Sequence, residues 1–258
     1  MTGRVTLVGG GPGREDLLTL AAVRALAEAD VVLYDRLAPH ERLAEFAPRA
    51  ELVDVGKRPG HHAIAQAEIE SLLVDHAGAG RHAVRLKGGD PYVLGRGSEE
   101  VLACHLAGVR VEVIPGITSA VAVPGAAGIP LTHRGISHLF TVVSGHAPLT
   151  ERELAHLAGL GGTIVVLMGV GSLPSLTAGL ARHGMSARMP VAIIERGFRA
   201  DQRTTIGELS DIVLAAGRAH ITSPAVVVVG DVVRLAHDGD SSAADLMSRA
   251  AGLTAVVQ

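Results

Sequence analysis

The chain has 258 residues, of which 48% are apolar, and a formal net charge of -3. These values predict a globular protein with a substantial core rather than a disordered chain. The weak negative charge and the 2% of aromatic residues, with no Trp, disfavour nucleic-acid binding through a basic surface or stacked aromatic rings. No apolar run reaches about 18 residues, and the single cysteine, Cys104, has no intramolecular disulfide partner. We therefore expect no membrane span, no nucleic-acid partner and a cytoplasmic location.

Short apolar runs in the first half of the chain predict buried strands at residues 4–10, 30–35, 50–56, 82–89 and 109–116. Two longer runs between them, residues 15–29 and 64–77, place apolar side chains at helical spacing. This alternation of strands and helices predicts a mostly parallel sheet that is covered on both faces.

The second half repeats the pattern more loosely. Strands are predicted at residues 138–145, 162–169, 189–197 and 224–233, and helices near residues 173–183 and 209–216. We expect an α/β protein of two α/β domains, residues 1–134 and 135–236, with the active-site cleft between them. Residues 237–258 begin with small and polar residues and are expected to form a mobile tail.

The loop after the first predicted strand is rich in glycine but lacks the features of a phosphate site. The dinucleotide fingerprint requires glycine at position 14, where this chain has Arg14. Pro12 removes a backbone donor that a phosphate would need, and no P-loop motif occurs. The run "VGGGPGRED" therefore predicts either a tight structural turn or a site for a nucleoside-like ligand without phosphates.

Charged side chains follow the next two predicted strands. Asp35 ends the second strand, where acids of parallel sheets lie toward the ligand crevice, although a surface pair with Arg36 is an alternative. Lys57 and Arg58 follow the third strand in a glycine-containing loop, and a solvated basic turn is the alternative there. No H-E-x-x-H or C-x-x-C run occurs, so we expect no metal site.

The run "GGDPYVLGRGSEE" follows the fourth predicted strand. Gly88 and Gly89 permit close backbone approach, and Arg96 between two glycines can fork onto a carboxylate. Glu99 or Glu100 can begin the next helix, where the helix dipole favours an acid. Helix initiation explains the glutamates but leaves the glycine-bracketed arginine unexplained.

The run "PGITSAVAVPGAAGIPLTHRG" follows the fifth predicted strand and supplies the hydroxyls of Thr118 and Ser119, and later His133 and Arg134. Unusual loops thus follow several strand ends at once. Since these ends meet at one edge of a parallel sheet, they predict a single ligand-binding edge.

Together, "VGGGPG", "VLYDRL", "VGKRPGHH", "LKGGDPYVLGRGSEE" and "GIPLTHRG" resemble the uroporphyrinogen-III C-methyltransferases of the tetrapyrrole methylase superfamily. The resemblance runs from about residue 4 to about residue 233. It implies S-adenosylmethionine as methyl donor, uroporphyrinogen III as a small-molecule substrate, and a homodimer. The implied reaction is two successive methylations that give precorrin-2.

The resemblance also implies roles for individual residues. Asp35 resembles the family's proposed proton acceptor and Lys57 its proposed proton donor, while Arg96, Glu99 and Arg134 resemble residues proposed to hold or deprotonate the substrate. Arg58 would add positive charge for a substrate with many carboxylates. The implied cofactor contacts are Pro12, Gly88, Gly89, Asp90, Val93, Thr118, Ser119, Met168, Gly197 and, more weakly, Ala225.

Other functions remain compatible with parts of the sequence. Within the superfamily these are a later precorrin methylase and an rRNA 2′-O-methyltransferase. Outside it, a nicotinamide-dependent dehydrogenase is disfavoured by Pro12 and Arg14, and a nucleoside-sensing module without catalysis is the third alternative.

Overall fold

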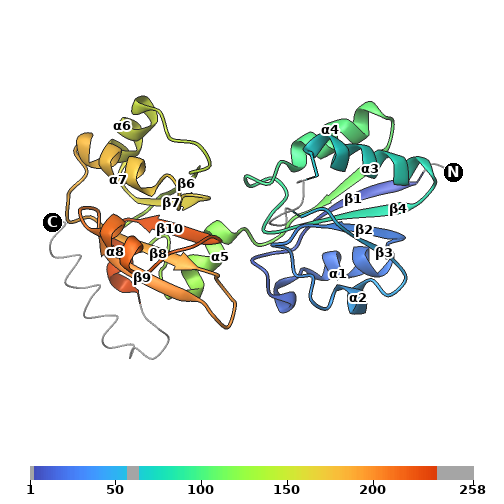
Figure 1. Cartoon of the computed structure of the whole chain (residues 1–258), viewed down its shortest axis with the longest axis horizontal. Coiled ribbons are helices and arrows are strands. Elements are labelled where there is room, and N and C mark those ends of the chain that lie inside the picture. Colours follow the sequence, from blue (N-terminus) through green and yellow to red (C-terminus); the bar gives the residue numbers. More distant parts are fainter. Residues whose placement is uncertain (1–2, 57–63, 237–258) are drawn as a thin grey trace. The chain divides into compact units, whose positions relative to one another are not determined.

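The computed structural model describes residues 3–56 and 64–236. The chain divides into two compact units, Met1–Ser119 and Ala120–Gln258 (Figure 1). The predicted tail, residues 237–258, and the predicted site residues Lys57 and Arg58 lie outside the described residues. Within the described residues, no helix is long and apolar enough to cross a bilayer.

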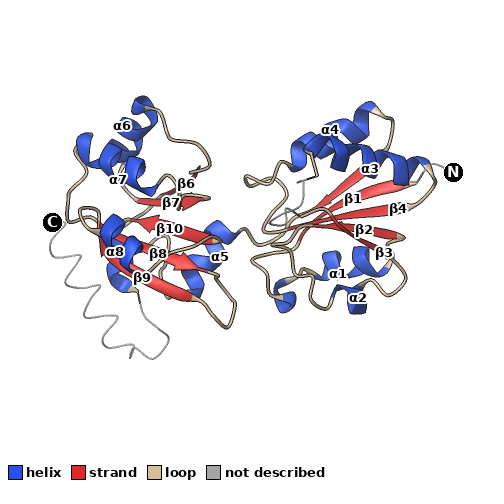
Figure 2. Ribbon diagram, viewed as in Figure 1, coloured by secondary structure: helices blue, strands red, loops and turns tan. Residues whose placement is uncertain are grey.

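The first unit is built on a five-stranded parallel sheet in the order β3-β2-β4-β1-β5. The strands are β1 (Arg4–Gly9), β2 (Val31–Tyr34), β3 (Glu51–Asp54), β4 (His82–Lys87) and β5 (Arg110–Ile114). The helices are η1 (Glu15–Leu17), α1 (Leu20–Ala27), α2 (Leu43–Phe46), α3 (Gln66–Gly78) and α4 (Gly97–Leu106). The predicted parallel sheet with helices on both faces is confirmed (Figure 2).

Alternate residues of each strand face opposite helical layers, as strand geometry requires. Val84 and Leu86 of β4 pack in the core formed with α1 and α2, whereas Ala83 packs in the core formed with α3 and α4. Arg85 and Lys87 share the parity of Ala83 and are also buried. The strand therefore places two cations beneath α3 and α4.

The predicted helix at residues 15–29 is interrupted in the structure. Thr19 has extended backbone torsions, and its side chain accepts a hydrogen bond from the Ala22 amide at 3.0 Å. Thr19 thus caps α1, because a threonine oxygen satisfies an amide that lacks a partner within the helix. The preceding residues form only the short helix η1.

The second unit contains a five-stranded mixed sheet in the order β6-β7-β10-β8-β9. Strands β6 and β7 are parallel, whereas β10 runs antiparallel to β7 and β8, and β9 runs antiparallel to β8. The strands are β6 (Phe140–Ser144), β7 (Thr163–Leu167), β8 (Pro190–Glu195), β9 (Arg203–Glu208) and β10 (Ala225–Val229). The helices are α5 (Ser119–Ala126), α6 (Glu151–Leu160), α7 (Leu173–Arg182), α8 (Ile212–Arg218) and η2 (Asp231–Leu235).

Strand β9 was not predicted; it is an exposed edge strand whose first residues are Arg203, Thr204 and Thr205. The predicted division between the halves follows residue 134, whereas the compact units divide after Ser119. The reason for the earlier division is packing: Val123 of α5 and Ile129 belong to the same core cluster as strand residues of the second sheet.

Candidate active site

Glycines join the loops that follow three adjacent strands, β4, β1 and β5. A Cβ atom on Gly9 would lie 2.3 Å from the Gly116 nitrogen, and one on Gly116 would lie 2.4 Å from the Gly89 oxygen. Gly11 and Gly89 exchange two backbone hydrogen bonds, of 3.1 and 2.7 Å. These loops approach one another so closely that no larger residue fits at Gly9 or Gly116.

Other glycines of these loops are packed less tightly than Gly9 and Gly116. A Cβ atom on Gly89 would find its nearest neighbour, the Ser119 nitrogen, at 3.7 Å, and one on Gly13 would find only the Leu37 oxygen, at 3.9 Å. Both residues have positive φ, +70° and +118°, which favours glycine. Gly88 is more confined, because its Cβ atom would lie 3.0 Å from Leu37. The exposed backbone at Gly13 is therefore available to a ligand, whereas Gly89 is buried beside Thr118 and Ser119.

Asp90 ties two of the loops together. Its Oδ2 accepts a hydrogen bond from the Gly116 amide at 3.1 Å, and its Oδ1 accepts one from the Tyr92 amide at 2.8 Å. The Val93 amide donates to the Asp90 carbonyl oxygen at 3.3 Å. The predicted cofactor residues of the first unit lie in the loops after β1, β4 and β5, except Ser119, which begins α5: Pro12, Gly88, Gly89, Asp90, Val93, Thr118 and Ser119.

Asp35 follows β2 at the same edge of the sheet. Its amide donates to the Leu86 carbonyl oxygen at 3.2 Å, which fixes its backbone beside β4. Its Oδ1 accepts a hydrogen bond from Arg85 Nη2 at 2.6 Å. The Asp35 side chain is 31% exposed, whereas that of Arg85 is 2% exposed. Asp35 thus presents a partly exposed carboxylate on a buried cation.

Arg85 belongs to a buried network of charged side chains that was not predicted. Its Nε donates to Glu100 Oε1 at 3.1 Å, and Lys87 Nζ donates to the same oxygen at 2.8 Å. Burial, and then the neighbouring Arg85 guanidinium, lower the pKa of Lys87, although Glu100 opposes this shift. The signal in the sequence was the placement of two cations at alternate positions of an apolar strand, because buried charges require partners.

Arg96 and Glu99, both predicted site residues, lie in contact with each other. Arg96 Nε donates to Glu99 Oε1 at 2.9 Å and Nη2 donates to Oε2 at 2.7 Å, while the side chains are 56% and 49% exposed. The shared hydrogen bonds raise the pKa of Arg96 and lower the pKa of Glu99. Because surface ion pairs are weak in water, Arg96 can exchange Glu99 for another carboxylate.

In the second unit, Met168 follows β7 and Gly197 follows β8, while Ala225 begins β10. Because β10 is antiparallel to both strands, with Ala225 opposite Glu195, these three predicted residues lie at one edge of the second sheet. Met168 has φ 58°, a strained conformation for a methionine.

Gly197 has a structural reason to be glycine. A Cβ atom there would lie 2.6 Å from Val123 Cγ2 of α5. Arg196 and Phe198 on either side also have positive φ, 48° and 65°. Strained residues of this kind gather at functional sites, and here they surround the loop after β8.

Arg134 is exposed in the turn closed by the bridge between His133 and Ser137, in the second unit.

The family model of the Tetrapyrrole (Corrin/Porphyrin) Methylases matches residues 4–213. The chain belongs to this family. A Methanosarcina barkeri protein named S-adenosyl-L-methionine-dependent uroporphyrinogen III methyltransferase is 48% identical over 92% of this chain and 94% of its own length. A Methanocaldococcus jannaschii uroporphyrinogen-III C-methyltransferase is 48% identical over 91% of this chain and 98% of its own length. A Thermus thermophilus uroporphyrin-III C-methyl transferase, solved with S-adenyl homocysteine, has a TM-score of 0.76 and 46% identity, covering 90% of this chain and 100% of that one.

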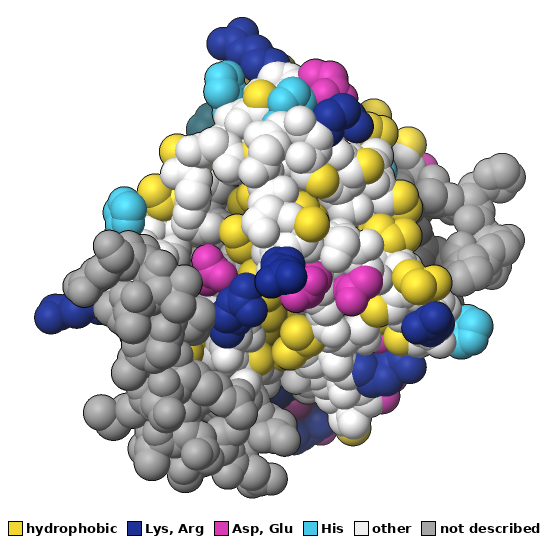
Figure 3. All heavy atoms as spheres, turned by 90° about the vertical axis from the view of Figure 1, so that its left-hand side faces the viewer, with side chains coloured by type: hydrophobic (Ala, Val, Ile, Leu, Met, Phe, Trp, Pro, Cys, Tyr) yellow, Lys and Arg dark blue, Asp and Glu magenta, His cyan; other side chains and the backbone are white. Residues whose placement is uncertain are grey.

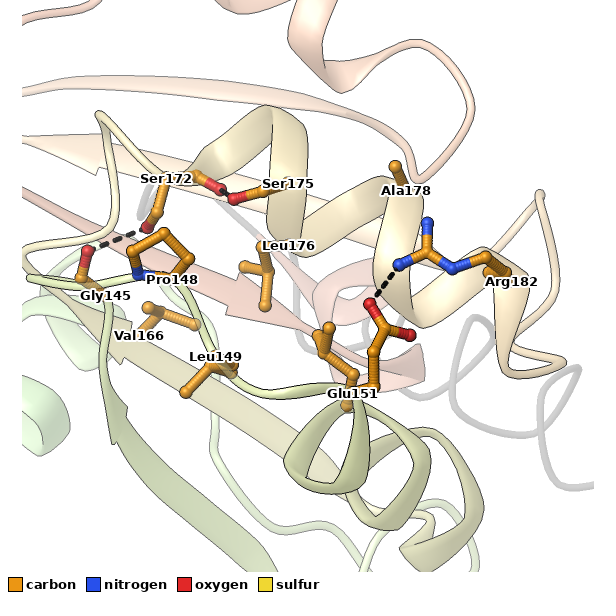
Figure 4. A pocket seen from close by; sticks show the side chains of 11 residues that line it. Gly145, Pro148, Leu149, Glu151, Val166, Ser172, Ser175, Leu176, Ala178 and Arg182 are labelled. Atoms are coloured by element: carbon orange, nitrogen blue, oxygen red, sulfur yellow. Dashed lines mark hydrogen bonds and ion pairs between the residues drawn. The ribbon is translucent and has the colours of Figure 1, made fainter.

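A separate hollow of this tetrapyrrole methylase lies against α6 and α7, and none of the predicted site residues lines it (Figure 4). Apolar side chains such as Leu154 and Leu176 line it together with Ser172, and Glu151 and Arg182 form an ion pair of 2.5 Å. On the face drawn in Figure 3, basic and acidic side chains lie next to each other rather than in a patch of one sign.

Cys104, the single cysteine of the tetrapyrrole methylase, lies buried on α4. Burial raises its pKa to about 11. The side chain is therefore a neutral thiol at neutral pH and is unsuited to act as a nucleophile. Within the described ranges, no cluster of three or more His, Cys, Asp or Glu side chains could hold a metal ion.

Proposed function

We propose that this tetrapyrrole methylase transfers methyl groups from S-adenosylmethionine to carbon atoms of uroporphyrinogen III, twice in succession, giving precorrin-2. The observation that carries the proposal is the similarity to proteins named for this activity, at 48% identity over nearly their whole length. The joined glycine loops and the Asp35 carboxylate at one edge of the first sheet supply a chemistry that agrees with it.

The first sheet's edge suits this cofactor. S-Adenosylmethionine carries no phosphate, which is consistent with Arg14 and Pro12 in the loop after β1. The exposed backbone at Gly13 would lie against the nucleoside. Met168 and Ala225 of the second unit remain predicted cofactor contacts. When bound, the cofactor supplies a methyl group made electrophilic by a positively charged sulfur.

Asp35 would accept a proton that the macrocycle releases. The substrate carbon would take the methyl group, and the electrons of the methyl–sulfur bond would stay on the sulfur. Every β-carbon of a uroporphyrinogen pyrrole already carries an acetate or propionate group, so the methylated carbon has no proton to lose, and the balancing proton must leave another atom of the macrocycle. The Asp35 carboxylate accepts a hydrogen bond from Arg85 through one oxygen, which leaves its other oxygen to accept that proton. Lys57 is the proposed proton donor.

Arg96 and Arg134 would hold carboxylates of the substrate, with Arg58 adding positive charge and Glu99 as a second acid beside Arg96. A guanidinium forks onto a carboxylate through two parallel hydrogen bonds. Arg96 already makes this contact with Glu99, so its side chain is held in a geometry that a substrate carboxylate could take over. Positioning of both reactants would then supply much of the rate.

The decisive experiment is incubation of the protein with methyl-labelled S-adenosylmethionine and enzymically made uroporphyrinogen III, followed by mass spectrometry of the macrocycle. Two added methyl groups are expected. Absence of methyl transfer to uroporphyrinogen III, with transfer to a later precorrin or to ribosomal RNA, would reassign the substrate. Binding of S-adenosylhomocysteine without any transfer would favour a sensing module.

We further propose that the protein is a cytoplasmic homodimer. Two leucines of α4 that lie one helical turn apart, Leu102 and Leu106, are exposed and could be covered by a second copy. Light scattering during gel filtration is expected to give twice the mass of the chain. If α4 lies in the interface, replacing Leu106 by glutamate should shift the measured mass toward that of the monomer.

A further inference from the structure

The buried charges beneath α4 form a continuous path to the candidate base. The Arg85 guanidinium donates four hydrogen bonds, to Glu100 Oε1, to the carbonyl oxygens of Leu33 and Leu86, and to Asp35 Oδ1. A guanidinium is planar and rigid, so three fixed acceptors determine where its remaining N–H groups point. The Nη2 atom is thereby directed at Asp35.

We propose that Arg85 is a positioning residue for Asp35 and that Glu100 holds Arg85 in place. This inference rests on the proposed function, because it gives Asp35 the role of proton acceptor. Arg85 engages Oδ1 of Asp35 at 2.6 Å, which assigns the incoming proton to Oδ2. Fixing one oxygen fixes the plane of the carboxylate, and hence the direction from which the other oxygen meets the substrate.

The exposed fractions of the charged side chains in this network support the inference that the buried groups position Asp35. Glu100, Arg85 and Lys87 have side chains that are 0%, 2% and 4% exposed, whereas Asp35 is 31% exposed. Two cations and two carboxylates balance the formal charge. An apolar set of similar volume often gives equal stability at such a position, so stability alone does not explain a buried network that ends at the candidate base.

Lys87 supports Glu100 rather than Asp35. Its Nζ donates to the same Glu100 oxygen that Arg85 Nε contacts, at 2.8 Å, and Gln66 of α3 donates to that oxygen at 3.2 Å. Three donors therefore converge on Oε1 of Glu100. This arrangement anchors the carboxylate of α4 against the strand and leaves Arg85 as the link to Asp35.

A double-mutant cycle tests the inference. Arg85→Gln and Asp35→Asn are made singly and together, and single-turnover methyl transfer to uroporphyrinogen III is measured with both ligands saturating. Misplacement of a catalytic group by a distant change costs about a hundredfold in rate, and we expect Arg85→Gln to slow transfer by about this factor. In the Asp35→Asn background, the same change should have almost no further effect, because contacting residues that act through one another are not additive.

Arg81→Gln is the matched control, since Arg81 immediately precedes β4 and binds the Asp30 carbonyl oxygen at the opposite edge of the same sheet. It should leave the transfer rate unchanged. Melting temperature and S-adenosylhomocysteine affinity are measured on every variant. If Arg85→Gln does not fold, the isosteric Glu100→Gln takes its place in the cycle and should show the same lack of additivity with Asp35→Asn.

The outcomes separate this inference from the function on which it rests. No transfer by the unaltered protein would overturn the proposed function. Normal transfer by Asp35→Asn would remove Asp35 from the chemistry, and the inference with it. Slow transfer by Asp35→Asn, together with an Arg85→Gln effect that multiplies in full in the double variant, would overturn the inference alone.

Discussion

Strand β2 carries an aspartate at each end, and the two aspartates serve different purposes. Asp30 precedes the strand, and its Oδ2 accepts a hydrogen bond from the His82 backbone amide at 2.7 Å. Asp35 follows the strand and accepts a hydrogen bond from the buried Arg85, while its own side chain is partly exposed. The amino edge of the first sheet thus uses its polar groups to hold the chain, whereas the carboxyl edge keeps charge available for a ligand.

The same contrast holds for the arginines and glycines at the two edges. At the amino edge, Arg81 binds the Asp30 carbonyl oxygen, and Gly3 fits against the Arg81 backbone, where a Cβ atom would lie 2.1 Å from the Arg81 oxygen. At the carboxyl edge, Gly9 and Gly116 are packed against neighbouring backbone, whereas Gly13 is exposed. Similar residues therefore differ in role according to the edge, and matched pairs of variants can test this.

The largest expected effect is on the rate of methyl transfer in Asp35→Asn. Loss of a general base typically costs about 10²- to 10⁴-fold in rate. Single-turnover transfer should fall by this factor, while S-adenosylhomocysteine affinity stays near that of the unaltered protein. Asp30→Asn, at the other end of the strand, should lower the melting temperature without slowing transfer. Equal transfer rates in the two variants would contradict the inference that only the carboxyl edge of the first sheet carries catalytic charge.

The next effect concerns Arg96. Hydrogen bonds to charged groups contribute about 1.5–3 kcal/mol, so Arg96→Ala should weaken uroporphyrinogen III binding by at least about tenfold. Arg96→Lys should not restore it, because an ammonium cannot fork onto a carboxylate. Arg42→Lys is the control, since Arg42 forms a similar exposed pair with Glu45 three residues later. Full restoration by lysine would show that Arg96 acts only as a positive charge.

Gly116→Ala at the carboxyl edge and Gly3→Ala at the amino edge should lower the free energy of unfolding of the protein to a similar degree. Forcing a methyl group into a packed site costs about 1–3 kcal/mol, which chemical denaturation can measure. Only Gly116→Ala should also weaken S-adenosylhomocysteine, as calorimetry would detect, because Gly116 supports the loops after β1 and β4. Weaker cofactor binding in Gly3→Ala would mean that the amino edge also shapes the site.

The smallest effect is the pH dependence of stability contributed by His82. Burial lowers the pKa of His82 from 6.5, and its ring contacts the Glu28 carbonyl oxygen and the Thr6 hydroxyl. The unfolded chain then binds the proton more readily, so the stability that neutral His82 provides is present above pH 6.5 and declines as pH falls below it.

The free energy of unfolding of His82→Gln should therefore vary less between about pH 7.5 and about pH 5.5 than that of the unaltered protein. Denaturation curves at the two pH values provide the test. The transfer rate should keep the same pH dependence in both proteins, because His82 lies at the amino edge. Parallel loss of stability in the two proteins would mean that other groups account for the acid sensitivity.

Local patterns in the sequence predicted the parallel sheet and the positions of Asp35 and Arg96 after its strands. The prediction succeeded because buried parallel strands are continuous apolar runs, and because glycine, proline and charge mark their ends. The mixed second sheet was predicted less completely from the sequence. The strand β9 begins with Arg203 and two threonines, and an exposed edge strand lacks the apolar run that burial imposes.

The sequence by itself determined which loops carry glycine and charge and therefore which edge of the first sheet can hold a ligand. Only the tertiary structure decided how those residues are used. It assigned Gly9 and Gly116 to contacts between loops, and it placed Glu100 and Arg85 in one buried network that reaches Asp35. These pairings depend on the parity of side chains along β4 and on the position of α4 above the sheet. Both are set by packing between segments distant in the chain, which a local pattern does not contain.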